Sequence, residues 1–219
     1  QELISSGKKV DAVIIEPIQC TVGDNHFSDK FLSKLRKITR ENQIPLIFDE
    51  VQTGFCSSGR VWYFQKFDWS PDIVVFGKKS QASGFFVKKG FDSIFEKGEA
   101  GRLCITFDGD IIDLVRCTHI IRHIRKNNIL ENVRERAKQL RAGLETLPVI
   151  NLRNCGLLFC FDFSTKNARD IFVTDLRKNN MICNPTGAKS VRLRPSLSVA
   201  KEEVSKAVDT IRKTLREME

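Results

Sequence analysis

Short apolar runs recur along the first half of the chain and predict buried strands. They lie at 11–17, 44–50 and 71–79, and each ends in charged or polar residues. Unbroken apolar runs of this length are typical of parallel strands that are covered on both faces. Because helical stretches separate the runs, the pattern predicts βαβ units and a mostly parallel sheet.

Apolar residues at helical spacing predict the helices. The first helix follows Ser28 or Asp29, either of which could cap it. A long helical pattern starts near residue 110, breaks or bends at 126–128 and ends by Pro148. The last 70 residues mix short strands with two amphipathic helices. We therefore expect an α/β fold, with one domain over residues 1–125 and a small α+β domain over residues 126–219.

Composition and charge narrow the function classes. The chain has 219 residues, a net charge of +9 and 41% hydrophobic residues, which suits a globular protein with a core. The basic residues are spread over helical stretches, so we interpret them as solvated surface and expect no nucleic-acid partner. No apolar run approaches the roughly 20 residues of a membrane span, so no membrane partner is expected. The chain starts with Gln and reaches a strand almost at once, which suggests a fragment.

The seven cysteines form no CxxC pair, and the three histidines complete no metal-ligand spacing with them. We therefore predict no metal site. An odd number of unpatterned cysteines is typical of reduced thiols. This predicts an intracellular protein, cytoplasmic or mitochondrial.

Polar groups follow the second and third apolar runs, where ligands gather in open α/β sheets. Asp49 ends the second run, and Lys78 follows Gly77 at the end of the third. Taken alone, Asp49 could simply cap the next turn, and Lys78 could be a surface residue as Lys79 is expected to be. A desolvated lysine at this place would instead have a lowered pKa, which favours imine chemistry.

Three motifs in this order carry a family resemblance: VDAVIIEPIQ, LIFDEVQTGFCSSG and PDIVVFGKK. Together they resemble the class III, fold-type I aminotransferases, which depend on pyridoxal 5'-phosphate (PLP). GDNHFS, the FGKK motif and RLCITFDGDIIDLVR look most like the lysine 6-aminotransferase branch, and next like the 4-aminobutyrate branch. The resemblance implies that residues 1–125 are the C-terminal part of a large PLP-binding domain. It also implies a homodimer that acts on a small amino acid and a 2-oxo acid.

The resemblance assigns roles to individual residues. Asp49 would pair with the pyridinium nitrogen of PLP, and Lys78 would hold PLP as a Schiff base and then carry protons. Val51 would pack on the ring, and Gln52 would hydrogen-bond near its phenolic oxygen. Thr106 would reach a cofactor phosphate across a dimer interface. The implied reaction moves the terminal amino group of lysine or a similar ω-amino acid to 2-oxoglutarate.

Departures from the family pattern qualify these roles. Arg192 stands where the family binds a substrate carboxylate, but Thr21 replaces the glutamate that relatives pair with that arginine. Phe55 stands where a smaller residue is common, and Asp108 would place a negative charge near the phosphate. The family's N-terminal half, with its glycine-rich phosphate loop, has no counterpart here. An alternative is therefore a truncated, catalytically silent homologue that acts as a binding partner or is a gene remnant.

Overall fold

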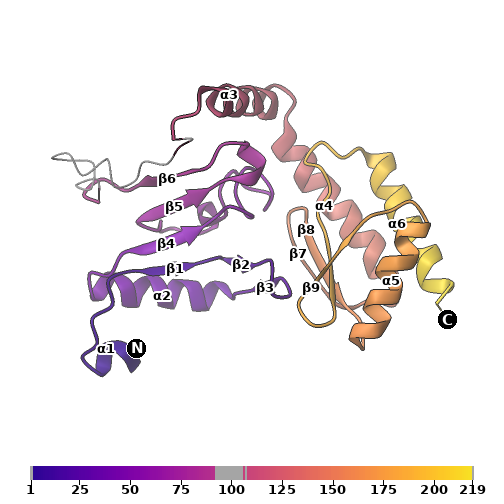
Figure 1. The fold of residues 1–219 in the computed structure, drawn as a ribbon, viewed down its shortest axis with the longest axis horizontal. Helices are drawn as coiled ribbons and strands as arrows, with labels where there is room; N and C mark the ends of the chain where they lie inside the picture. Colours follow the sequence, from indigo (N-terminus) through magenta and orange to yellow (C-terminus); the bar gives the residue numbers. More distant parts are fainter. Residues whose placement is uncertain (1, 92–105, 107, 219) are drawn as a thin grey trace. The chain divides into compact units, whose positions relative to one another are not determined.

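The computed structural model describes residues 2–91, 106 and 108–218 (Figure 1). The chain forms two compact units. The first contains Gln1–Pro17, Phe27–Gly54 and Tyr63–His123, and the second contains Ile18–His26, Phe55–Trp62 and Ile124–Glu219. The predicted division at 125/126 stays a prediction. The structure adds two early segments that belong to the second unit, which a linear division does not include.

A four-stranded sheet forms the centre of the first unit. In sheet order, its strands are β1 (Val13–Ile15), β4 (Leu46–Asp49), β5 (Ile73–Phe76) and β6 (Gly84–Val87). β1, β4 and β5 run parallel, and β6 pairs antiparallel with β5. The predicted mostly parallel α/β sheet is therefore confirmed. The carboxyl ends of the three parallel strands lie along one edge of the sheet.

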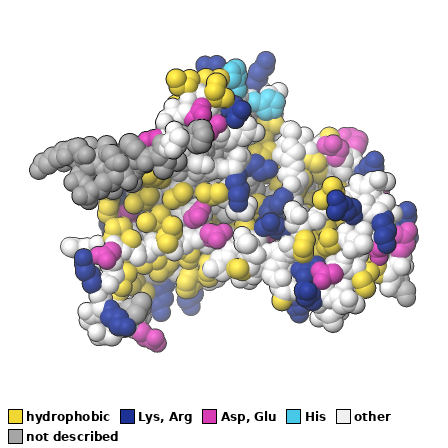
Figure 2. All heavy atoms as spheres, viewed as in Figure 1, with side chains coloured by type: hydrophobic (Ala, Val, Ile, Leu, Met, Phe, Trp, Pro, Cys, Tyr) yellow, Lys and Arg dark blue, Asp and Glu magenta, His cyan; other side chains and the backbone are white. Residues whose placement is uncertain are grey.

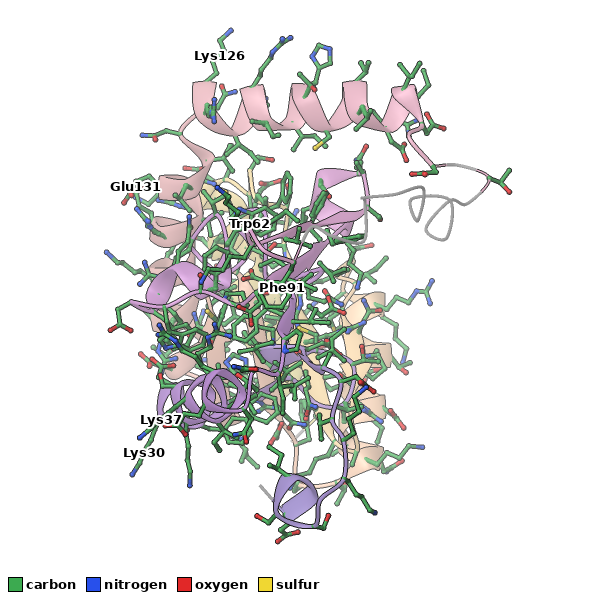
Figure 3. All side chains as sticks on the ribbon, turned by 90° about the vertical axis from the view of Figure 1, so that its left-hand side faces the viewer. Lys30, Lys37, Trp62, Phe91, Lys126 and Glu131 are labelled. Atoms are coloured by element: carbon green, nitrogen blue, oxygen red, sulfur yellow. The ribbon has the colours of Figure 1, made fainter. Side chains whose placement is uncertain are left out.

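The helical elements of the first unit are α1 (Glu2–Ser5), α2 (Asp29–Glu41), η1 (Tyr63–Lys66), η2 (Lys78–Ser80) and α3 (Ile111–Lys126), whose residues from Ile124 onward belong to the second unit. Ser28 rather than Asp29 caps α2, because its hydroxyl accepts the Phe31 N–H at 3.2 Å. Nothing on α3 is buried, and Lys126 at its end points outward in Figure 3. Across the described residues, every helix is too short or too polar to cross a membrane.

A buried ion pair fixes α2 against the sheet. Arg36 donates two hydrogen bonds to Asp72, at 2.6 and 3.0 Å, and Asp72 also accepts the Leu46 N–H at 3.0 Å. Burial alone would raise the pKa of Asp72, but the Arg36 guanidinium and the Leu46 N–H outweigh it and hold the pKa below its usual value. On the other side of α2, Lys30 and Lys37 point away from the unit (Figure 3).

Only one face of the sheet is covered by α2. Phe48 packs edge-on against Trp69 with ring centroids 5.8 Å apart, and the Trp69 indole donates to Ser33 of α2 at 3.3 Å. Strand side chains alternate between faces, so Ile47 and its partner Ile14 lie on the opposite face. Ile14 is 64% exposed, and Figure 2 shows hydrophobic side chains gathered over these strands. Parallel sheets are normally covered on both faces, so this face is atypical for one.

The second unit is an antiparallel sheet packed against three helices. In sheet order, its strands are β7 (Ile150–Cys155), β8 (Leu158–Asp162), β10 (Ser190–Leu193) and β9 (Asn184–Thr186). Residues 154–163 include the end of β7, the turn at Gly156 and all of β8, so this stretch is part of a hairpin. The reason is Gly156, whose φ of +55° permits the turn between β7 and β8.

The helices of the second unit are α4 (Ile129–Glu145), α5 (Lys166–Lys178) and α6 (Lys201–Arg216). The predicted break at 126–128 is confirmed, because Asn128 adopts a left-handed φ of +53° between α3 and α4. The largest core side chains come from β8 and the three helices. They include Leu144, Phe159, Phe161, Phe172 and Ile211.

The segment Ile18–His26 contains the hairpin of β2 (Ile18–Gln19) and β3 (Asn25–His26). Asp24 lies in the connection between the two strands and is fully buried. Both of its carboxylate oxygens accept from Arg194, at 2.5 and 2.7 Å. Arg153 donates to the carbonyl oxygens of Gly23 and Asp24. Arginines from the C-terminal sheet therefore hold this early segment in the second unit.

Candidate functional site

Asp49 and Lys78 follow neighbouring parallel strands of the first unit. Asp49 is the last residue of β4 and pairs with Val75 of β5, three residues before Lys78. Because both strands end at the same sheet edge, a carboxylate and a lysine are brought to one region. The sequence predicted this arrangement.

The Asp49 carboxylate has one partner. Its Oδ1 accepts the Val51 N–H at 3.0 Å, so the turn-capping interpretation of this residue is realised. No cationic side chain within the described parts of the chain pairs with it, and its second oxygen accepts no hydrogen bond from them. Asp49 is partly buried. It can therefore accept from a further cationic donor.

Lys78 starts η2 with a left-handed φ of +52°, which is unusual for a residue with a side chain. Such backbone conformations occur preferentially at functional sites. Its side chain is exposed, whereas Lys79 is partly buried. The expected desolvation of Lys78 is therefore wrong for this chain. The reason is that β5 ends at Phe76, so Lys78 lies beyond the sheet.

Gly77 provides a close approach of the backbone to Val51. A Cβ atom at Gly77 would lie 3.7 Å from both Val51 methyl carbons and 3.1 Å from Ser83 Oγ. Val51 is thus held beside the residue that precedes Lys78. Val51 therefore links Asp49, which accepts its N–H, to the backbone just before Lys78.

The other predicted cofactor residues, Gln52 and Thr106, make no contact with described residues that indicates a ligand. Gln52 is partly buried in the turn after β4, and its side chain makes no hydrogen bond with any described residue. Thr106 and Asp108 lie in exposed turns. The adjacent residues 92–105 and 107 are outside the described part of the chain. The roles of Gln52 and Thr106 stay predictions.

Arg192 lies on β10 in the second unit. It donates to the Cys20 carbonyl oxygen at 3.0 Å, and its Nε is buried without a hydrogen-bond partner. Thr21 is exposed, and no carboxylate in the described residues forms an ion pair with Arg192. The guanidinium can therefore take a carboxylate ligand.

One buried residue beside the predicted site was not assigned from the sequence. Glu50, between Asp49 and Val51, is buried and bonded to the start of η1. A second carboxylate at the end of a buried strand was the only sequence signal for it. Phe55, which stands where the family commonly has a smaller residue, belongs to the second unit and is buried against Trp62, with ring centroids 5.3 Å apart.

Burial raises the thiol pKa of four of the six described cysteines: Cys56, Cys117, Cys160 and Cys183. Cys104 lies outside the described residues, and none of the other six forms a disulfide. Burial raises the pKa of Cys160 and Cys183 to about 12, which keeps these thiols protonated. In the described parts of the chain, no group of three or more metal-ligating side chains could hold a metal ion.

Comparisons with known proteins agree with this geometry. The family Aminotransferase class-III matches residues 2–215. The chain is 36% identical over 210 residues to L-lysine-epsilon aminotransferase of Mycobacterium tuberculosis H37Rv, a match that covers 92% of this chain and 47% of the relative. It is also 36% identical over 221 residues to 4-aminobutyrate aminotransferase of Kluyveromyces lactis, covering 95% and 46%.

A solved structure shows the same fold. Lysine aminotransferase from M. tuberculosis in the internal aldimine form matches with a TM-score of 0.92 and 33% identity, covering 99% of this chain and 52% of that one. The present chain thus spans about half the length of the relatives it matches. Its sheet and small domain correspond to part of the PLP-transferase fold. The chain belongs to the class III aminotransferase family.

Proposed function

We propose that this chain carries the PLP-attaching part of an aminotransferase that moves the terminal amino group of lysine or a similar ω-amino acid to 2-oxoglutarate. One observation carries the proposal: Asp49 and Lys78 stand at the ends of neighbouring parallel strands in a class III aminotransferase fold. The names of the lysine aminotransferase relatives support the donor. We expect the working protein to be a homodimer.

The donor set fits PLP. The ligand has a cationic ring nitrogen and a carbonyl group, and its substrates carry carboxylates. Asp49 retains an oxygen for a cationic N–H, Lys78 makes no ion pair with described residues, and Arg192 has no carboxylate partner among them. Asp49 and Lys78, at neighbouring strand ends of the first unit, are thus left open to an external partner. Arg192 of the second unit is separately open to a carboxylate.

PLP supplies an electron sink for the electrons released at the substrate carbon. Asp49 would keep a proton on the ring nitrogen through its carboxylate, and the Lys78 amine would attach the cofactor and then move a proton at the substrate carbon. The apolar Val51 side chain would exclude water from one ring face. Gln52 would donate a hydrogen bond near the phenolic oxygen of PLP. Thr106 would donate to the phosphate of the PLP bound by the partner subunit.

Arg192 would bind the substrate carboxylate through the fork of its guanidinium. The Cys20 carbonyl fixes one of its nitrogens, which limits the orientations that the guanidinium can take. Because Thr21 has no charge, it does not compete with the substrate for this arginine.

Cofactor attachment gives the direct test. Adding PLP to the purified chain is expected to give a visible imine absorption band. Borohydride reduction and peptide mapping should then place the label on Lys78, and Lys78→Ala should remove it. The adjacent Lys79 is the internal control. A label on Lys79, or on no residue of a folded chain, would contradict the site assignment.

The amino donor is tested by comparing lysine, ornithine and 4-aminobutyrate, each with 2-oxoglutarate as acceptor. We expect the highest kcat/KM for lysine, and turnover should disappear in Lys78→Ala. A preference for 4-aminobutyrate would move the assignment to the second group of relatives. Turnover that persists without Lys78 would exclude the mechanism.

A catalytically silent binding protein is the second candidate. One observation favours it: the sheet of the first unit leaves Ile14 and Phe85 well exposed. Apolar surface of this kind marks interaction sites. A folded chain that takes up no PLP would support this candidate.

A further inference from the structure

The buried carboxylate of Glu50 is the most completely bonded polar group near the predicted site. Glu50 is 1% exposed, and both of its oxygens accept hydrogen bonds. Oε2 accepts the Tyr63 N–H at 2.6 Å and the Thr53 hydroxyl at 3.2 Å, and Oε1 accepts the Phe64 N–H at 2.9 Å. Tyr63 and Phe64 are the first residues of η1, whose N–H groups have no partner within the helix.

The backbone of Glu50 is equally constrained. Its N–H donates to the Val75 carbonyl oxygen of β5, and its own carbonyl oxygen accepts the Gly54 N–H, both at 2.9 Å. Glu50 therefore joins the end of β4, the turn at 51–54 and the start of η1. Between the turn and η1, the chain leaves the first unit as Phe55–Trp62 and returns. The Glu50 carboxylate therefore bonds the segment before Phe55–Trp62 to the segment after it.

The turn held in this way contains the residues proposed to face the cofactor. Asp49 precedes Glu50 and accepts the Val51 N–H, and Val51 packs beside Gly77. If the hydrogen bonds from Tyr63 and Phe64 to Glu50 broke, the backbone of Val51 would lose its fixed position. The hydrogen bond from the Val51 N–H to Asp49 would then be lost as well.

We propose that Glu50 is a positioning residue that holds Asp49 and Val51 in place by fastening the start of η1 to the end of β4. This inference rests on the proposed function only in the use it gives to Asp49 and Val51. The fastening itself can be measured without the cofactor.

The hydrogen bonds of Glu50 to η1 can be followed by titration, because the surroundings of Glu50 shift its pKa. Burial raises the pKa of Glu50 to about 7, although the N–H groups of Phe64 and Tyr63 and the Thr53 hydroxyl act in the opposite direction. Two charged residues belong to the elements that Glu50 joins: Asp49, the last residue of β4, and Lys66, the last residue of η1. Lys66 is engaged by the Tyr63 hydroxyl and by Asp29. Ionisation of Glu50 therefore falls in an accessible pH range.

Hydrogen exchange of the turn is the first test. In Glu50→Gln at pH 8, the amides of Val51, Gly54 and Tyr63 are expected to exchange about tenfold faster or more, because a bond to a charged acceptor is lost. Asp72→Asn is the matched control, since it removes the charge of another buried carboxylate, at the opposite end of β5. It should leave these amides unchanged. Equal protection in Glu50→Gln and the wild type would overturn the proposal.

A pH titration of tryptophan fluorescence is the second test, because Trp62 directly precedes Tyr63. The wild type should show a transition near pH 7 that Asp72→Asn keeps and Glu50→Gln lacks. Thr53→Val removes a hydroxyl that lowers the pKa of Glu50, so the midpoint of the fluorescence transition should move to higher pH. This variant provides the test if Glu50→Gln does not fold. An unmoved midpoint would contradict the proposal. Failure of the wild type to bind PLP would count against the proposed function and leave this inference standing.

Discussion

Replacing Gly156 by alanine is expected to destabilise the second unit by about 3–5 kcal/mol. Gly156 has a φ of +55°, and a Cβ atom there would lie 2.4 Å from both Gly59 N and Ser57 O. These neighbours are backbone atoms, so they cannot move aside as a side-chain end can. The Leu157 N–H also donates to Ser57 O, which fixes the two segments together. Urea unfolding, followed by Trp62 fluorescence in a Trp69→Phe background, measures the effect.

Gly109→Ala is the control for this substitution. Gly109 has a similar φ of +67°, but a Cβ atom there would meet no atom of the described residues within 4 Å. Its cost should be limited to the left-handed backbone, about 1–2 kcal/mol. If the two variants lost the same stability, the close approach at Gly156 would not be the cause.

Asp24→Asn is expected to cost about 3–5 kcal/mol, the usual penalty for breaking a buried ion pair. Asp24 is fully buried, and Arg194, at 18% side-chain exposure, donates to both of its oxygens. Without the carboxylate, Arg194 keeps only uncharged acceptors: the carbonyl oxygens of Phe159 and Leu193 and the single amide oxygen of the new side chain. A positive charge would then be held with little compensation. Denaturant unfolding with the same fluorescence probe measures the loss.

Asp209→Asn is the matched control. Asp209 also pairs with an arginine, Arg212, but 71% of its side chain is exposed. Exposed pairs contribute about 0–1 kcal/mol, so this change should be nearly silent. In addition, Arg194→Met should cost much less in the Asp24→Asn background than alone. Additive losses would show that the pair is not coupled.

The sequence predicted the features that depend on local pattern. The apolar runs ending at Asp49 and Gly77 gave the two central parallel strands, and Ser28 was one of two predicted caps. The exposure of Lys78 was missed, because the pattern does not show where β5 ends relative to the lysine. The environment of Glu50 was also missed. Its partners are the N–H groups of Tyr63 and Phe64, and backbone donors leave no trace in residue type.

Contacts between residues far apart in the sequence could not be predicted either. Nothing in the composition around Asp24 identifies Arg194 as its partner, since many arginines in this basic chain would serve. The hairpin around Gly156 was missed for a related reason. The residues on both sides of the glycine are apolar and favour strand, and only its contact with Gly59 and Ser57 shows that a turn is required.

Because early segments of the chain belong to the second unit, the two units become complete at different times during translation. Asp24 and Arg194 are 170 residues apart, so at ribosomal speed roughly 10 to 30 s pass between their appearances. All segments of the first unit precede residue 124, and its sheet can form while translation continues. The second unit needs its early segment and its last strands together. We therefore expect it to close only after β10 and Arg194 have emerged, with the nascent chain carrying Asp24 without this partner until then.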